Sequence, residues 1–337
     1  MKKVALFIIL GALCAAAAIL LPGFLCQYKK SVVEKTVVYV PVEATYSQLL
    51  DSVATAVQDM KSFGKAAKIA GLQESFKPGR YTFTPDKTNK DLARMLKLGW
   101  ETPMMLTLSG NIRGLEKLSG ILGKRLAADS AAFMEHFSKE EVWKGNGFEK
   151  ETFMAMFLPN TYEVYWTITP QKFVERMKKE YEKFWNSERI AKAKEIGLSP
   201  MEVSILASIV CEETNYGPEM PTVAGVYMNR LKKGMKLDAD PTVKFALNDP
   251  TIKRILFRHL EVESPYNTYK HAGLPPGPIT IPSIKGIEAV LNYGHHNYLY
   301  FCANANMDGT HKFARSLGEH NRNAREYQAA LNRMKIR

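Results

Sequence analysis

The chain has 337 residues, of which 46% are hydrophobic and 24% are charged. This composition excludes a disordered or fibrous protein, and the length leaves room for two or more folded domains. The formal net charge of +12 agrees with nucleic acid, an anionic membrane surface or an acidic polymer as the partner.

An uncharged segment at the N-terminus predicts a membrane anchor within residues 1–30. Residues 4–28 carry no charge and are long enough to cross a bilayer as a helix. The alternative is a cleaved signal peptide, but the apolar run is longer than a usual signal core and shows no convincing small-x-small site ahead of Gln27. Lysines flank both ends and leave the orientation open. For an anchored chain we expect a membrane surface or an acidic polymer as the partner, and no nucleic acid.

Residues 31–103 predict a small α+β module. Its first segment is rich in β-branched and aromatic residues, and a later helix has a capping residue and an apolar stripe. The predicted elements are a strand over residues 35–42, a helix from Tyr46, a turn and strand over 79–85 and a helix over 88–98.

A second small α+β unit with a linker helix is expected over residues 104–195. It begins with a strand over 104–108 and a helical pattern over 113–126. Residues 171–194 are strongly charged with a helical pattern, which predicts one solvated helix that leads into the last domain.

The most informative helix follows Ser199. Ser199 and Glu202 have the spacing of a capping box, and Pro200 suits the first turn, so the helix should begin near residue 201. At about 100° per residue its apolar side chains form one broad arc, and Glu213 projects near the middle of that arc. The residues on the opposite side are Ser204, Ser208 and Cys211.

The position of Glu213 predicts a general acid, with Glu212 at the edge of the arc. A carboxyl at the end of a buried stripe is partly desolvated, which disfavours its charged form and raises its pKa. A general acid that works near neutral pH needs such a pKa. The alternative interpretation is a carboxyl in solvent, or one paired with a cation such as Arg230 or Lys236.

Polar groups that suit a substrate lie further along the chain. After a predicted helix over 220–231, Asp240 precedes Pro241, so we interpret Asp240 as the N-cap of a new helix, as a substrate-facing carboxylate, or as both. A long Pro- and Gly-rich loop over 264–282 is of a kind that usually connects elements at the surface. This loop nevertheless offers stacking faces, amides and hydroxyls for holding a sugar, from Tyr266, Asn267, Thr268 and Tyr269.

The C-terminal segment predicts a strand over 298–301 and a helix that carries His320. Outside the anchor the only cysteines are Cys211 and Cys302; there is no CxxC pattern, and the histidines are scattered. The sequence leaves open whether these two cysteines form a disulfide. We expect no metal site and no cofactor.

These motifs, taken in order, resemble the YceG-like (MltG) family of endolytic murein transglycosylases, and the resemblance covers nearly the whole chain. A departure is Cys211, where the family commonly has an acidic or polar residue. The segments that carry the resemblance are Lys77–Gly99, which is similar to the family's LysM-like module, Leu158–Tyr162, Leu206–Thr214, Asn229–Leu231, Asp240–Val243, Ser264–Tyr269 and Gly273–Ile279.

The resemblance implies an α+β fold with an N-terminal transmembrane helix, a LysM-like module and a mixed helix and strand catalytic domain over 196–337. Glu213 corresponds to the catalytic glutamate of the family. It further implies a single-pass protein of the bacterial cytoplasmic (inner) membrane, with the catalytic domain on the periplasmic or external side and peptidoglycan synthases as further partners. Residues expected to bind the glycan strand are Glu212, Asn229, Asp240, Thr242, Tyr266, Asn267 and Thr268.

The reaction implied by the resemblance cleaves the β-1,4 bond between N-acetylmuramic acid and N-acetylglucosamine without water, leaves a 1,6-anhydromuramyl end and would terminate strand elongation. One carboxyl can serve both steps, first as the acid for the glycosidic oxygen and then as the base for the C6 hydroxyl. Hydrolysis would need a second carboxyl, for which Asp240 is the candidate.

Two other classes of function are the alternatives. One is a non-catalytic peptidoglycan-binding or scaffold protein of the cell envelope. The other is a pyridoxal-phosphate lyase, for which the sequence offers no Gly-rich phosphate cup near a plausible lysine.

Overall fold

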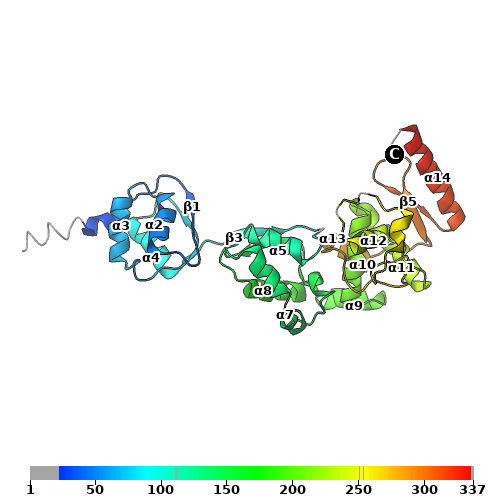
Figure 1. Ribbon diagram of the computed structural model, residues 1–337, viewed down its shortest axis with the longest axis horizontal. Coiled ribbons are helices and arrows are strands. Elements are labelled where there is room, and N and C mark those ends of the chain that lie inside the picture. Colours follow the sequence, from blue (N-terminus) through cyan, green and yellow to red (C-terminus); the bar gives the residue numbers. More distant parts are fainter. Residues whose placement is uncertain (1–22, 111, 250, 253, 335–337) are drawn as a thin grey trace, which may run out of the picture. The chain divides into compact units, whose positions relative to one another are not determined.

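A computed structural model describes residues 23–110, 112–249, 251–252 and 254–334 of the chain (Figure 1). The chain divides into two compact units. The first contains the residues up to 106 together with 125–128 and 162–169, and the second contains 107–124, 129–161 and the residues from 170 onward. The finer domain boundaries that the sequence suggested stay a prediction.

The predicted membrane anchor lies mostly outside the described residues. Within the part of the chain that the structure describes, no helix combines the length and the apolar character needed to cross a membrane.

The first unit contains two paired strands and three helices within residues 31–103. Strands β1 (Thr36–Val40) and β2 (Gly79–Phe83) pair antiparallel, with Val38 opposite Tyr81. Both of these side chains are buried, because alternate residues of the two strands face the helices. The helices are α2 (Tyr46–Ala54), α3 (Met60–Ile69) and α4 (Asn89–Leu98), and Thr45 and Thr88 close capping boxes at the starts of α2 and α4.

A cluster of aromatic rings forms one core of the second unit. Phe133 and Phe137, from α6 (Ser130–Phe137), contact rings from the 3-10 helix η1 (Phe153–Met156) and from α8 (Pro170–Phe184). Ring contacts of this kind add to the burial of apolar area. Further helices of the second unit are α5 (Leu115–Gly123) and α7 (Glu140–Gly145). Strands β3 (Met104–Leu108) and β4 (Asn160–Val164) pair with each other, and each has residues in both units.

The prediction of one linker helix over 171–194 is wrong, because the segment forms two helices. Helix α8 ends at Phe184, Trp185 turns into the core, and α9 (Ser187–Glu195) begins after it. The side chain of Asn186 accepts a hydrogen bond from the backbone N–H of Arg189 at 3.0 Å, so this asparagine is an N-cap that starts a new helix.

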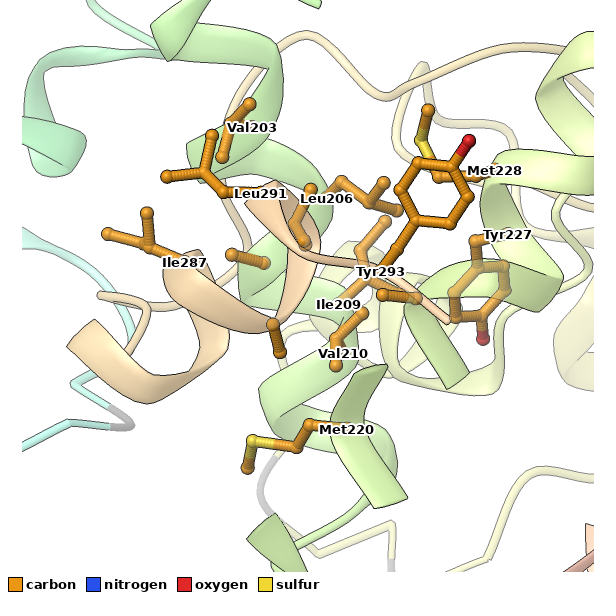
Figure 2. Close-up of a cluster of buried hydrophobic side chains, with 14 of the residues drawn as sticks. Val203, Leu206, Ile209, Val210, Met220, Tyr227, Met228, Ile287, Leu291 and Tyr293 are labelled. Carbon is orange, nitrogen blue, oxygen red and sulfur yellow. The ribbon is translucent and has the colours of Figure 1, made fainter. Parts of the chain in front are cut away.

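The larger core of the second unit surrounds α10 (Pro200–Glu213). The predicted capping box of Ser199 and Glu202 is confirmed. Figure 2 shows apolar side chains of α10 meeting those of α11 (Met220–Lys232) and α13 (Ile284–Leu291). The labelled side chains are Val203, Leu206, Ile209, Val210, Met220, Tyr227, Met228, Ile287, Leu291 and Tyr293.

Helix α10 is buried on both sides, on its apolar arc and on the opposite side that carries the polar residues. Ser204, Ser208 and Cys211 are all buried as well. Gly286 of α13 lies so close that a Cβ atom there would collide with the Cys211 sulfur. The other covering comes from the loop over 264–282, whose Ile279 N–H donates to Ser208 Oγ at 3.0 Å.

The loop over 264–282 lacks helices and strands, as predicted, but it is not a surface connector. Ile279, Thr280 and Ile281 are buried, and the Ile281 N–H donates to the carbonyl oxygen of Ile112 at 3.0 Å. The loop therefore replaces a secondary-structure element as one wall of the core.

The C-terminal part is a hairpin followed by a long helix. Strands β5 (Tyr300–Ala303) and β6 (His311–Ala314) pair antiparallel, and α14 (Leu317–Arg333) packs beside them. The strand begins at Tyr300, two residues later than predicted, because the Tyr298 N–H donates to the ring of His296 at 3.1 Å.

Candidate active site

Glu213 is the last residue of α10, where the chain leaves the helix for an extended Thr214. Its Oε1 atom accepts a hydrogen bond of 2.6 Å from the hydroxyl of Tyr227 on α11. Tyr227 is almost fully buried, and its ring contacts Phe301 edge to face at 5.9 Å between centroids. The two helices and the hairpin thus hold the carboxyl in one place.

Burial raises the pKa of Glu213 to about 7. The hydrogen bond from Tyr227 acts against this rise, while the nearby carboxylates of Asp240 and Glu212 add to it and Arg230 lowers it. The negative end of the α10 macrodipole also disfavours a charge at this position. Glu213 can therefore keep its proton close to neutral pH.

Arg230 lies in the same cavity but is occupied by other acceptors. Its guanidinium donates to the carbonyl oxygens of Leu299, Lys236 and Leu237 and pairs with Asp238 at 3.0 Å. The alternative in which a cation such as Arg230 or Lys236 neutralises Glu213 is therefore wrong: no salt bridge to Glu213 occurs among the described residues.

Asp240 is brought to the same place by α12 (Asp240–Leu247). The prediction that Asp240 caps this helix is wrong, because Ala239 is the N-cap and no side chain makes the cap bond. Instead, Asp240 Oδ1 accepts a hydrogen bond of 2.7 Å from the hydroxyl of Tyr269. Its carboxylate consequently lies on the wall of the cavity beside Glu213.

Three cavities share Glu213 in their walls. One, of about 370 Å³, lies between α11, α12, the hairpin and α14, and it also contains Asp240 and Tyr269. A second, of about 600 Å³, extends along the segment after α10 and the tip of the β5–β6 hairpin. The third, of about 310 Å³, contains Glu212 and Asp240 as well. The carboxyl is thus reached from more than one direction.

Glu212 points into the third cavity and forms a salt bridge with Arg113. Its side chain is 9% exposed, whereas that of Arg113 is 40% exposed. Three of the predicted site residues, Glu212, Glu213 and Asp240, are therefore together in one cavity.

The other predicted binding residues lie beneath the site or away from it, and none lines the three cavities described above. Thr242 and Thr268 are buried and joined by a hydrogen bond of 2.8 Å, and Thr268 Oγ1 accepts from the N–H of Ala239 at 3.0 Å. These two threonines therefore fix the start of α12, and with it Asp240.

Asn267, Tyr266 and Asn229 also make contacts within the fold. Asn267 is fully buried and donates to the carbonyl oxygens of Leu260 and Val262. The Tyr266 ring packs on Phe245 at 4.7 Å, and Asn229 donates to the carbonyl oxygen of His296 at 2.7 Å and to that of Tyr298 at 3.0 Å. A direct contact of these three residues with substrate stays a prediction.

The sequence reasoning missed Tyr227 and did not select Tyr269 for the site. The signal for Tyr227 was present, because a tyrosine on the buried stripe of a helix needs a partner for its hydroxyl. For Tyr269 the signal was weaker, since a loop residue has no periodicity from which its direction can be inferred.

A hydrogen-bonded pair, Glu219 and His311, lies at the second cavity. Glu219, at the end of the 3-10 helix η2 (Gly217–Glu219), is 9% exposed and accepts from the backbone N–H of His311 at 2.9 Å. Its other oxygen lies 2.7 Å from His311 Nδ1. This carboxylate thus holds both the start of β6 and the imidazole ring that faces the cavity.

Cys211 and Cys302 are both free thiols, so the bridge left open by the sequence does not form. Over the described part of the chain, no group of three or more His, Cys, Asp or Glu side chains is placed to hold a metal ion.

Comparisons with known proteins agree with this architecture. A model described as the YceG-like family matches residues 38–326. An endolytic murein transglycosylase of Bacillus subtilis (strain 168) is 41% identical over 127 residues, which are 38% of this chain and 34% of the relative. One from Streptococcus pneumoniae serotype 2 (strain D39) is 28% identical over 173 residues, 50% of this chain and 31% of the relative.

A solved structure of a yceG-like protein from Listeria monocytogenes has a TM-score of 0.56 and 25% identity to this chain. The match covers 86% of this chain and 98% of that one. The chain spans about a third of the length of the curated relatives it matches.

Proposed function

The chain belongs to the YceG-like family, and on this premise we propose that it is an endolytic lytic transglycosylase of peptidoglycan. It cleaves the β-1,4 bond between N-acetylmuramic acid and N-acetylglucosamine within glycan strands and leaves 1,6-anhydromuramyl ends. The names of the relatives support this activity, since two of them are endolytic murein transglycosylases. A cut of this kind would terminate the elongation of a nascent strand.

The observation that carries the proposal is the raised pKa of Glu213, about 7, in a wall shared by three cavities. In its protonated form Glu213 donates to the glycosidic oxygen as the bond breaks through an oxocarbenium-like state. The carboxylate that results then takes the proton of the C6 hydroxyl, whose oxygen attacks C1. The proton returns to Glu213, and no water is consumed.

Tyr227 and Asp240 assist this cycle in different ways. The Tyr227 hydroxyl donates to Glu213 at 2.6 Å, which orients the carboxyl and stabilises its charged form after the first proton transfer. Asp240 places a negative charge near the developing oxocarbenium ion and is the second carboxyl that a hydrolytic variant of the reaction would use.

The same proposal includes the cellular location of the chain, the role of its first unit and its neighbouring proteins. A helix within residues 1–30 anchors the chain once in the bacterial cytoplasmic membrane, with the catalytic part outside the cytoplasm. The first unit is a LysM-like module that holds glycan, which is supported by its order of strand, two helices and strand. Peptidoglycan synthases are the expected neighbours of an enzyme that trims nascent strands.

The test is mass spectrometry of fragments after peptidoglycan is incubated with the full-length chain or with Glu213→Gln. Anhydromuramyl ends from the parent and none from the variant are expected. The control is Glu182→Gln, which makes the same change on an exposed part of α8 and should keep the parent's activity. Reducing ends would instead indicate hydrolysis. Binding without cleavage by parent and variant would favour the scaffold protein.

A further inference from the structure

Positive charge is distributed unevenly around Glu213. The cavity of about 310 Å³ is lined by three cations, Arg113, Lys244 and Arg254, beside the carboxylates of Glu212, Glu213 and Asp240. Among the described residues, the wall of the cavity of about 600 Å³ contains no lysine or arginine. In the remaining cavity the described wall residues include one lysine or arginine, Arg230, whose guanidinium is already bound by backbone oxygens and Asp238.

Two of the three cations keep their charge available. Within the described residues no salt bridge involves Lys244 or Arg254, and Arg113 is shared with Glu212. Lys244 projects from the last turn of α12 and is half-buried, and Arg254 is exposed. This side of the site therefore presents two cations without a salt-bridge partner among the described residues, beside the carboxylate of Asp240 and the catalytic carboxyl.

The sugar backbone of a glycan strand offers no partner for these charges, because its hydroxyl and acetamido groups are neutral. The acidic groups of peptidoglycan lie on the peptides that branch from the muramic acid residues. Arginine and lysine bind carboxylates through charge-assisted hydrogen bonds, and a partly enclosed cavity strengthens such contacts.

Resting on the proposed function, we propose that the cavity of Arg113, Lys244 and Arg254 binds a carboxylate of the peptide on a muramic acid residue next to the scissile bond. The cations then distinguish peptide-bearing strands from glycan that carries no free carboxylate. They also fix the direction of the strand, since the peptide of that residue must lie on the α12 side of Glu213 and not on the hairpin side.

The experiment compares the full-length chain on two substrates: uncrosslinked strands with their peptides, and bare strands, from which an amidase has removed the peptides and in which the lactyl carboxylates that this leaves on the muramic acids have been converted to amides. Lys244 and Arg254 would each form an exposed salt bridge of about average strength with the peptide carboxylate. Together they predict that kcat/KM is roughly fivefold higher for the peptide-bearing strand than for the bare strand. In the double variant Lys244→Gln/Arg254→Gln this ratio should fall toward one. The matched control, Lys179→Gln/Lys183→Gln on the exposed face of α8, should keep the parent's ratio.

A chemical change in the substrate tests the same point without altering the fold. Amidation of the peptide carboxylates should remove the preference of the unmodified enzyme. The inference is overturned if the parent cleaves bare and peptide-bearing strands equally well, or if the preference survives amidation or the double substitution. Failure of the proposed function has a different signature, because the parent would then produce anhydromuramyl ends from neither strand.

Discussion

Replacing Glu213 by glutamine should stabilise the protein at alkaline pH. In the unfolded chain this carboxyl ionises near pH 4.5, whereas in the fold it keeps its proton until about pH 7. Between these values the folded state binds the additional proton, so the free energy of unfolding falls as the pH rises, and the full penalty is present above pH 7. The rise of the pKa from 4.5 to about 7 corresponds to a penalty on the order of 3 kcal/mol.

Glutamine has no such penalty, and its amide oxygen can still accept the hydrogen bond from Tyr227. The charged and titratable groups that face position 213 are unchanged in the variant; they are Tyr227, Asp240, Glu212 and Arg230. A difference between parent and variant that depends on pH in the window from 4.5 to about 7 therefore reports the ionisation of Glu213.

The assay is calorimetric unfolding of the full-length proteins at several pH values between 4 and 8. For a unit of about 200 residues, the penalty predicts that the variant melts roughly 6 to 12 °C above the parent at pH 8 and at nearly the same temperature at pH 4. Glu182→Gln, at a side chain that is 61% exposed, should shift the melting temperature little at either pH. If the melting temperatures of Glu213→Gln and the parent differed by the same amount at pH 5 and pH 8, the conclusion that burial raises the pKa of Glu213 would be refuted.

Tyr227→Phe removes the hydrogen bond that stabilises the charged form of Glu213, so the pKa of Glu213 should rise further. The alkaline limb of the pH–rate profile should then move to a pH about one unit higher. A limb at the same or a lower pH would contradict this. Gly286→Ala should destabilise the second unit by about 1 to 3 kcal/mol, because the new methyl group collides with the Cys211 sulfur. Combining it with Cys211→Ala should recover much of that loss in urea unfolding, and additive losses would argue against the contact. Thr268→Val leaves the N–H at the start of α12 without its acceptor, which should cost about 1 to 3 kcal/mol in the same assay. A loss below about 0.5 kcal/mol would show that this bond does not hold the helix.

Local patterns predicted those parts of the fold that local interactions determine. The capping boxes at Thr88 and Ser199 and the strands at 36–40 and 79–83 lie where propensity and hydrogen-bonding side chains specify them. The position of Glu213 at the end of a buried helix followed from periodicity in the same way. Where one side chain overrides a pattern, as Asn186 does within a charged helical segment, the prediction failed.

The rest of the site depends on contacts between segments that are distant in the sequence. Tyr269 reaches Asp240 across 29 residues, and Arg113 meets Glu212 across 99. Periodicity gives the direction of a side chain only relative to its own element, so such pairs cannot be derived from one sequence. For the same reason the buried hydroxyl of Thr268 looked like a ligand for sugar, although the start of α12 uses it.

The three cavities that meet at Glu213 also bear on how reaction rate depends on polymer length. A carboxyl that several cavities share can meet a bond in the interior of a long strand, without a free end having to thread into the site. The concentration of cleavable bonds then scales with the mass of polymer and not with the number of chain ends. A few long strands would be cut as readily as many short ones of the same total mass, and each cut would shorten the average strand without first consuming it from its terminus.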